Sequence, residues 1–380
     1  MRNVRSFFLF VGLLYVGLFL SGCSRKEEPK SKESSKIVFA FAAPLSGDQA
    51  VTGQDMLRGA QLAIKQINES GGVLGSNIEL DINDDKANNN EAGIIANLVS
   101  SKNEVLAVIG HLNSGCSNAA LPVYNKNGIP MLTPVSTDDK LSGLGYRSFF
   151  RIPLKNSLQG RYAATYAVGK LKMKTFFLID DGSPYGKGIV DEFAKSVTSM
   201  GGVIVERDQV SEKDREFRQL LSKVKSHKVD LVYLGIMYPQ AGPLIKQAKE
   251  SGITSKFFGG DGLFGGTLLQ YPTDGVYVTF IAPLAARDSI QEHFFQRFKA
   301  EFKDSVNSYA PLAYDAVMIT AKALAEAGSP NRSKLIERLH ANGFEYSGVT
   351  GNIRFDSNGD SVDRKTFLYI VMNEKFVLVE

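Results

Sequence analysis

Two turns rich in serine and threonine contain the side chains of this sequence that are best suited to bind a small anion. The first turn, residues 110–117, contains Ser114, and the second, residues 134–139, contains Ser136 and Thr137. Each follows an apolar run. A turn that leads from a strand into a helix presents N–H groups and hydroxyls at the positive end of the helix dipole, which suits a carboxylate. If the two strands are neighbours in one sheet, both turns lie at the same edge. For either turn taken alone, helix capping is the favoured explanation.

An aspartate in a glycine-rich loop is the candidate for the opposite charge. The segment Gly260–Gly265 fits the pattern GxGxxG, but a dinucleotide fold needs a full helix after this motif. Pro272 and Gly275 follow too closely for such a helix, and Asp261 would place a carboxylate against a pyrophosphate. We therefore expect a loop at the end of a strand that presents Asp261 to the occupant of a cleft.

A thiol and an imidazole raise the alternative of a hydrolase. His111 and Cys116 could act as base and nucleophile, yet the sequence identifies no group that orients the base and no oxyanion donor. A lone cysteine is more often buried and unreactive. The acidic cluster Asp356–Asp360 is better explained as a turn around Asn358-Gly359 than as a metal site. No metal and no cofactor are expected.

The elements that must position these residues alternate between short apolar runs and amphipathic helical stretches, the pattern of an α/β fold. Continuous apolar runs are typical of strands buried on both faces of a parallel sheet. Strands are predicted at 37–45, 78–82, 105–110, 129–135, 175–179, 203–206, 231–237 and 276–281, and helices at 56–67, 289–302, 311–327 and 333–341. A terminal hairpin is predicted around Asn358-Gly359, with Phe355 on one strand and residues 367–372 on the other. This alternation of strands and helices breaks off once and then begins again, which predicts two doubly wound parallel-sheet lobes.

Length and charge limit the class of protein further. A chain of 380 residues is long enough for about two domains. Its formal net charge of +4 implies no nucleic-acid partner.

The N-terminus has the pattern of an export signal. Basic residues at positions 2 and 5 precede an apolar run over residues 7–20, which is too short for a stable membrane span. The following Ser21-Gly22-Cys23 resembles the lipobox of bacterial lipoproteins, in which the cysteine is lipidated and becomes the first residue. Residues 1–22 are therefore expected to be removed, Cys23 to anchor the protein to a bacterial membrane, and the polar residues 23–36 to form a tether. An ordinary signal peptide is the alternative. With Cys23 acylated, Cys116 is the only thiol left, so no internal disulfide is expected.

Several segments together resemble the leucine/isoleucine/valine-binding protein family. Besides the two polar turns they are Ala43-Pro44-Leu45-Ser46-Gly47, Gly110-His111 and Pro184-Tyr185-Gly186, in the same order along nearly the whole mature chain. Members are type I periplasmic binding proteins, in which two α/β lobes joined by three crossing segments close on an amino acid and deliver it to an ABC transporter. The resemblance implies that residues 37–153 and 284–345 form one lobe and that 154–283 and 346–380 form the other. It also implies a monomer that is not an enzyme.

The resemblance assigns roles at the two poles of a bound amino acid. Ser114, Ser136 and Thr137 match residues that hold the α-carboxylate. Asp261 matches the acidic residue that pairs with the α-ammonium, in agreement with the chemistry of the turns. The implied function is that of an extracytoplasmic solute-binding lipoprotein for an amino acid, branched-chain or otherwise aliphatic, which serves the permease subunits of an ABC transporter.

The residues implied around the ligand side chain include two departures from the family pattern. Tyr185 matches an aromatic wall from the second lobe and Tyr309 an aromatic beside the side-chain pocket, although ordinary packing between lobes explains either. Met237 and Tyr238 stand where paired aromatics are common, and Thr52 stands where some members have a large aromatic. The pocket is therefore expected to be wider or more polar than one for leucine. An amide or an aromatic acid is an alternative ligand, and sensing with signalling to a membrane partner is an alternative function.

Overall fold

The computed structural model describes residues 37–282, 288–304 and 308–379. These residues belong to one compact unit of the chain, Ser35–Glu380. The predicted leader, the tether and the lipidation site Cys23 lie outside the described residues. Among the helices that the structure describes, none is both long and apolar enough to cross a bilayer.

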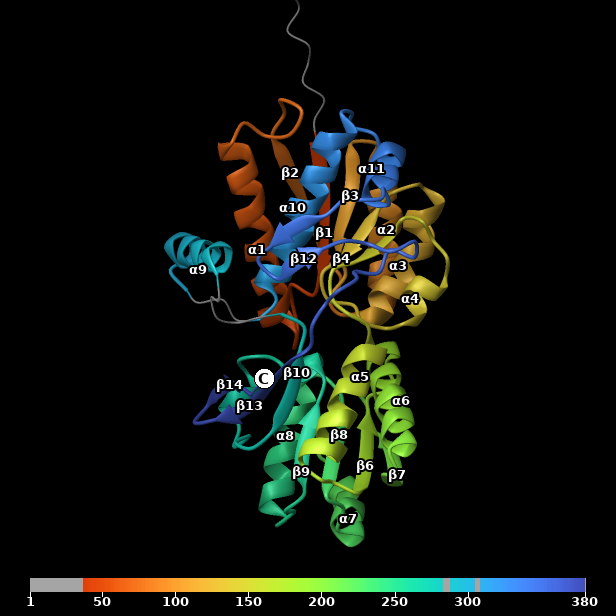
Figure 1. Cartoon of the computed structure of the whole chain (residues 1–380), viewed down its shortest axis with the longest axis vertical. Coiled ribbons are helices and arrows are strands. Elements are labelled where there is room, and N and C mark those ends of the chain that lie inside the picture. Colours follow the sequence, from red (N-terminus) through yellow and green to blue (C-terminus); the bar gives the residue numbers. More distant parts are fainter. Residues whose placement is uncertain (1–36, 283–287, 305–307, 380) are drawn as a thin grey trace, which may run out of the picture. The chain divides into compact units, whose positions relative to one another are not determined.

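The first lobe is built on a sheet of five parallel strands (Figure 1). In sheet order they are β2 (Ile78–Asp84), β1 (Ile37–Ala43), β3 (Val105–Gly110), β4 (Met131–Thr133) and β5 (Phe149–Arg151). The helices packed with this sheet are α1 (Ala50–Glu69), α2 (Asn89–Ser100), α3 (Ser114–Lys126) and α10 (Ala310–Ala327).

Both faces of this sheet are covered, which explains why β1 is apolar without interruption. Successive side chains of β1 point to opposite faces. Phe39 and Phe41 belong to the cluster that includes α1 and α10, whereas Ala40 and Ala42 belong to the cluster that includes α2 and α3.

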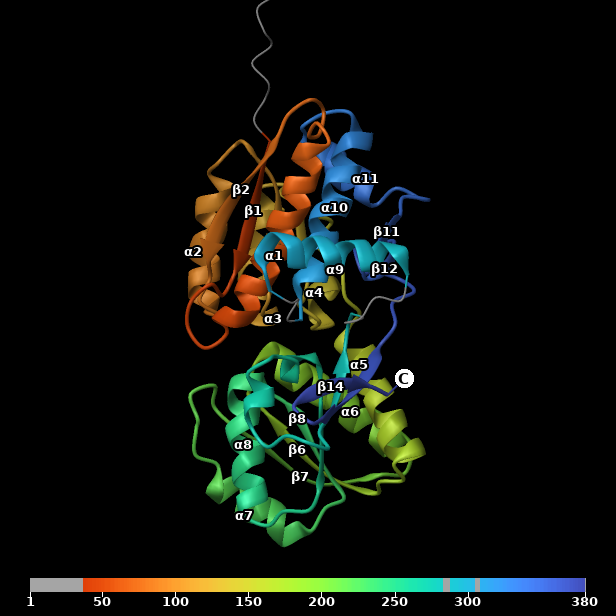
Figure 2. The same ribbon diagram turned by 90° about the vertical axis from the view of Figure 1, so that its left-hand side faces the viewer.

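The second lobe is built on a sheet of seven strands, five of them parallel. In sheet order they are β14 (Lys375–Leu378), β13 (Phe367–Met372), β10 (Tyr277–Phe280), β9 (Lys256–Gly259), β8 (Leu231–Gly235), β6 (Thr175–Asp180) and β7 (Val203–Gln209). Figure 2 shows α5 (Asn156–Thr165) and α6 (Pro184–Ser199) on one side of this sheet and α7 (Arg218–His227) and α8 (Tyr238–Glu250) on the other. The two lobes are therefore both doubly wound α/β units, as the sequence predicted.

Short helices and one small hairpin complete the described elements. They are α4 (Lys140–Gly143), the π-helix η1 (Tyr166–Lys170), the 3₁₀-helices η2 (Asp261–Leu263) and η3 (Leu268–Gln270), α9 (Ser289–Phe302), α11 (Arg332–Leu339), and the strands β11 (Tyr346–Gly348) and β12 (Gly351–Ile353).

In chain order, the described elements change from one lobe to the other after β5, after β10 and before β13. Hydrogen bonds hold the β11–β12 region to the first lobe, because the Asp315 carboxylate on α10 accepts from the N–H groups of Val349 and Thr350 at 2.9 and 2.7 Å. Arg151 on β5 pairs with Asp360. Residues 346–361 thus contact elements of the first lobe, which differs from the predicted division at residue 345.

The predicted terminal hairpin around Asn358-Gly359 is wrong. β13 pairs antiparallel with β10 on one side and with β14 on the other, and the turn between β13 and β14 is Asn373-Glu374. The Asn-Gly turn instead closes only the bridge between Phe355 and Ser361. A Cβ at Gly359 would lie 1.9 Å from the carbonyl oxygen of Phe149, so this turn packs directly on β5. The turn residues were recognised correctly, but their partner was a distant strand.

Candidate functional site

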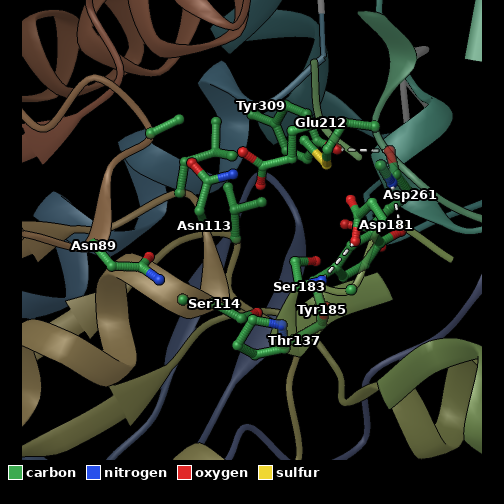
Figure 3. Close-up of a pocket in the computed structure, with 18 residues that line it drawn as sticks. Asn89, Asn113, Ser114, Thr137, Asp181, Ser183, Tyr185, Glu212, Asp261 and Tyr309 are labelled. Atoms are coloured by element: carbon green, nitrogen blue, oxygen red, sulfur yellow. Dashed lines mark hydrogen bonds between the residues drawn. The ribbon is translucent and has the colours of Figure 1, made fainter. Parts of the chain in front are cut away.

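A cavity of about 240 Å³ lies where the strands of both sheets end (Figure 3). It is lined from the first lobe by the segments after β2, β3 and β4 and by Tyr309 before α10, and from the second lobe by the loops after β6, β7, β8 and β9. The polar and aromatic side chains in the lining are those of Asn89, Asn113, Ser114, Thr137, Asp181, Ser183, Tyr185, Glu212, Asp261 and Tyr309. The carboxyl ends of parallel strands are the usual place for ligands in open α/β sheets.

The two serine- and threonine-rich turns meet at one edge of the cavity. β3 and β4 are parallel neighbours, so the turns that follow them are adjacent, as predicted. The first turn leads directly into α3, whose N-cap residue Asn113 makes no side-chain cap hydrogen bond. The first N–H groups of a helix lack partners within the helix, so this end of α3 suits an anion. The second turn leads only into the four-residue helix α4.

Ser114 and Thr137 line the cavity from these turns. Ser114 is buried, and its hydroxyl accepts a hydrogen bond from the N–H of Asp138 at 3.3 Å, which leaves the hydroxyl proton able to donate. Thr137 is 1 % exposed, and its hydroxyl has no hydrogen-bond partner among the described residues. A buried hydroxyl without a partner is costly, so a ligand acceptor at this point would stabilise the site.

Asp261 lines the cavity from the second lobe. It begins η2, directly after β9, so the loop presents it as the sequence predicted. Its carboxylate accepts from the side-chain amide of Gln159 at 2.8 Å, and its carbonyl oxygen accepts from the Tyr309 hydroxyl at 2.7 Å. Burial raises the pKa of Asp261 to about 6, although hydrogen bonds from Gln159 and Tyr185 lower it. A cation beside this carboxylate would remove much of the cost of its burial.

Tyr185 and Met237 form the wall beside Asp261. The Tyr185 hydroxyl accepts a hydrogen bond from the N–H of Gly262 at 2.7 Å. A Cβ at Gly262 would lie 2.7 Å from the Tyr185 ring and 2.9 Å from the Met237 sulfur, so glycine lets both side chains pack on this loop. Burial also raises the pKa of Tyr185 well above its ordinary value, which keeps its hydroxyl neutral.

Ser136 does not line the cavity. Its hydroxyl contacts the Ser117 hydroxyl at 2.7 Å and the carbonyl oxygens of His111 and Leu112 at 3.2 and 3.1 Å. Ser136 therefore joins the two polar turns to each other from within the protein. The turn was identified from the sequence, but the direction of each side chain depends on the neighbouring turn.

Thr52 and Tyr238 also lie outside the cavity lining, and they connect the lobes. The Thr52 hydroxyl on α1 donates to the Tyr238 hydroxyl on α8 at 3.2 Å. The Tyr238 hydroxyl in turn lies 3.3 Å from the carbonyl oxygen of Asp48. In this structure both residues join α1 to α8, and neither lines the cavity.

Several polar residues of the lining were missed from the sequence. Asp181 directly follows β6 and precedes the Pro184-Tyr185-Gly186 segment, so the rule that located Asp261 could have found it. Glu212 lies in the loop between β7 and α7, where no sequence pattern marks it. Asn89 and Asn113 come from the starts of α2 and α3.

The hydrolase alternative does not fit the geometry. Cys116 is fully buried and does not line the cavity, and burial raises the pKa of its thiol far above the ordinary value. His111 is also fully buried, and its Nδ1 lies 2.7 Å from a carboxylate oxygen of Asp85. A cysteine nucleophile must be ionised and must be able to reach its substrate. Cys116 meets neither condition.

Two doubly wound lobes with a polar cavity between their strand ends define a protein that binds a small solute. The chain belongs to the periplasmic binding protein family, whose model matches residues 36–374. This family is extracytoplasmic and binds solutes, and the protein is not an enzyme.

The similar proteins include amino-acid-binding proteins. The chain is 33 % identical to a leucine-, isoleucine-, valine-, threonine- and alanine-binding protein of Pseudomonas aeruginosa, over 87 % of this chain and 88 % of that protein. A leucine-binding protein of Thermotoga maritima has a similar structure, with a TM-score of 0.85 and 28 % identity over 90 % of this chain and 98 % of that one. A branched-chain amino acid transporter substrate-binding protein of Streptococcus pneumoniae, in complex with isoleucine, is also similar in structure. Its TM-score is 0.84, and the identity is 29 % over 90 % of this chain and 99 % of that one.

Proposed function

We propose that this protein captures an α-amino acid between its two lobes and presents it to the permease of an ABC transporter. The observation that carries the proposal is the composition of the cavity, with hydroxyl groups and a helix N-terminus on one side and a buried carboxylate on the other. A zwitterion needs donors at its carboxylate and an acceptor at its ammonium. The cavity offers both within one volume.

In the proposed complex, the first lobe holds the α-carboxylate. Ser114 and Thr137 donate their hydroxyl protons, and the free N–H groups at the start of α3 add to the binding of negative charge. Asp261 accepts from the α-ammonium, and Tyr185 and Tyr309 fix the loop that bears Asp261. Ligand contacts from both lobes would favour the closed arrangement of a hinge.

The ligand side chain is proposed to be aliphatic along its stem. Leu112, Val135 and Met237 supply apolar surface to the cavity. The relatives named above are described as binding leucine, isoleucine, valine, threonine or alanine, which supports an amino acid with an aliphatic side chain as the ligand.

A thermal-shift screen of the full chain tests the proposal. The panel contains the L-amino acids, acetamide as an amide and benzoate as an aromatic acid. We expect at least one L-amino acid to stabilise the protein, by about 2.7 kcal/mol when it is present at 100 times its dissociation constant. Stabilisation by benzoate or acetamide alone would contradict the proposal, and so would no response to any amino acid.

The proposed membrane attachment has a separate test. We infer that the lipid on Cys23 anchors the protein at a bacterial membrane, from which residues 23–36 let the body reach the permease. Metabolic labelling with a radioactive fatty acid should label the parent protein and leave the variant Cys23→Ala unlabelled. An unlabelled parent protein, or equal labelling of both proteins, would refute the anchor.

A further inference from the structure

The cavity holds more negative charge than a zwitterionic ligand can neutralise. Its described lining includes the carboxylates of Asp181, Glu212 and Asp261, and it includes no lysine, arginine or histidine. All three carboxylates come from loops of the second lobe (Figure 3). An α-amino acid with an uncharged side chain brings one ammonium, which the proposed function places at Asp261. Two carboxylates would then face the bound ligand without a cation.

Asp181 lines the cavity and has one buried carboxylate oxygen without a hydrogen-bond partner among the described residues. The residue is 7 % exposed, and its Oδ1 accepts from the N–H of Ser183 at 3.0 Å. Its Oδ2 has no hydrogen-bond partner among the described residues. Burial is the main cause that raises the pKa of Asp181 to about 6; hydrogen bonds from the side chain and N–H of Ser183 lower it, and the charges of Glu212 and Asp180 raise it further. The side chain is therefore mostly ionised at neutral pH, and a buried ionised oxygen without a donor is costly.

A second unpartnered acceptor lies across the cavity. The Asn113 amide donates through Nδ2 to the side-chain oxygen of Gln49 at 2.9 Å. Its Oδ1 is then left without a partner among the described residues. This acceptor belongs to the first lobe, so it is independent of the acidic loops.

Glu212 is held at the cavity by its own loop. The side-chain amide of Gln240, a buried residue at the start of α8, donates to the Glu212 carbonyl oxygen. In the same loop, Arg215 forms an ion pair with Asp48 of the first lobe. These two contacts hold the loop backbone at Glu212 and three residues after it, and the Glu212 side chain lines the cavity.

We propose that the ligand is an α-amino acid whose aliphatic side chain ends in a second cationic group, which Asp181 and Glu212 bind. This inference rests on the proposed function, because it assumes that the α-ammonium occupies Asp261. The apolar residues of the lining receive the methylene stem, and Asn113 accepts a further hydrogen bond from the side-chain cation. An ammonium or guanidinium group supplies several donors and a positive charge at once.

The decisive comparison uses two amino acids that differ only at the end of the side chain. L-Lysine is L-norleucine with an ammonium on its terminal carbon. We expect calorimetry on the full chain at pH 7.5 to give a dissociation constant for L-lysine at least about tenfold lower than for L-norleucine, because a hydrogen bond to a charged group outweighs a neutral one. Equal or tighter binding of L-norleucine would overturn the inference and leave the proposed function standing.

Two variants assign the preference to the named carboxylates. Asp181→Asn and Glu212→Gln should each reduce the ratio of lysine to norleucine affinity by about threefold or more. Glu216→Gln is the matched control, because Glu216 lies in the same loop, pairs with Arg218 and does not line the cavity. The ratio of lysine to norleucine affinity in this control variant should equal that of the parent protein. An unchanged ratio in both cavity variants would overturn the inference.

The proposed function fails in a different way. If no L-amino acid of the thermal-shift panel stabilises the protein, or if Asp261→Asn binds L-lysine and L-norleucine as tightly as the parent, the amino-acid site itself is refuted, and the inference with it.

Discussion

Replacing Asp261 with asparagine should weaken ligand binding and at the same time stabilise the ligand-free protein. The substitution keeps the size and shape of the side chain and removes its charge. Asparagine can still accept from the Gln159 amide, which lies 2.8 Å from the Asp261 carboxylate. The change therefore tests the charge alone.

The expected gain in stability follows from the pKa of Asp261. Burial raises this pKa from 3.8 to about 6, a shift of about two units, which corresponds to about 3 kcal/mol. Because the pKa is raised in the folded state, the contribution of the protonated carboxyl is fully present below about pH 4 and is lost as the pH rises through about 6. At pH 7 the free energy of unfolding of the ligand-free variant should exceed that of the parent by up to about 3 kcal/mol. Near pH 4 the difference should vanish.

The expected loss of binding has the opposite sign. Removing one partner of a buried charge pair typically costs about 2 to 5 kcal/mol, so the dissociation constant for L-norleucine should rise roughly 30-fold or more. Urea unfolding at pH 7 and pH 4 measures the stability, and calorimetry measures the affinity.

A matched control separates burial from ligand contact. Asp315 is fully buried, and its pKa is also raised to about 6, but it bonds to Val349 and Thr350 and does not line the cavity. Asp315→Asn should therefore leave the ligand affinity unchanged. The reasoning is refuted if Asp261→Asn retains the parent affinity, or if it is less stable than the parent at pH 7 without ligand.

Four further predictions concern the same cavity. Ser114→Ala and Thr137→Val should each weaken amino-acid binding in calorimetry by about 1 to 2 kcal/mol through loss of a donor, and parent-like affinities would show that the carboxylate lies elsewhere. The affinity for L-norleucine should fall as the pH is lowered from 7 to 5, because protonation of Asp261, with its pKa of about 6, removes the charge that binds the ammonium; a flat profile would contradict this. Tyr238→Phe should raise the dissociation constant at least about fivefold, because it removes the hydrogen bonds of the Tyr238 hydroxyl with Thr52 and Asp48 of the first lobe, each worth about 1 kcal/mol, and unchanged binding would rule out a role in closure. Iodoacetamide should not label the buried Cys116 of the native protein, which mass spectrometry can check; rapid labelling would contradict its burial.

Much of the fold was predictable because it depends on local patterns. The strand predicted at 105–110 and the helix predicted at 289–302 have the same bounds as β3 and α9. A strand buried on both faces must be apolar throughout, so its limits are visible in composition alone. The terminal hairpin failed because strand partners are not local. Phe367 and its neighbours pair with β10, almost 90 residues earlier in the chain, and the Asn-Gly turn packs on β5.

The candidate site was predictable where a residue directly follows a buried strand. Ser114, Thr137 and Asp261 all stand after apolar runs, and the three line one cavity. Ser136 is adjacent to Thr137 but faces the other turn, because its hydroxyl satisfies two buried carbonyl groups. Glu212 reaches the cavity only through contacts of its loop with α8 and with the first lobe, which no local pattern encodes.

If both poles of one dipolar molecule bind in this cavity, three ligands with the same carbon chain can separate the contribution of each pole. L-Norleucine carries both poles, hexanoate lacks the ammonium, and L-norleucinamide lacks the carboxylate. Calorimetry on the full chain at pH 7.5 should show L-norleucine binding at least about tenfold more tightly than either analogue. Hexanoate or L-norleucinamide binding as tightly as L-norleucine would contradict the account.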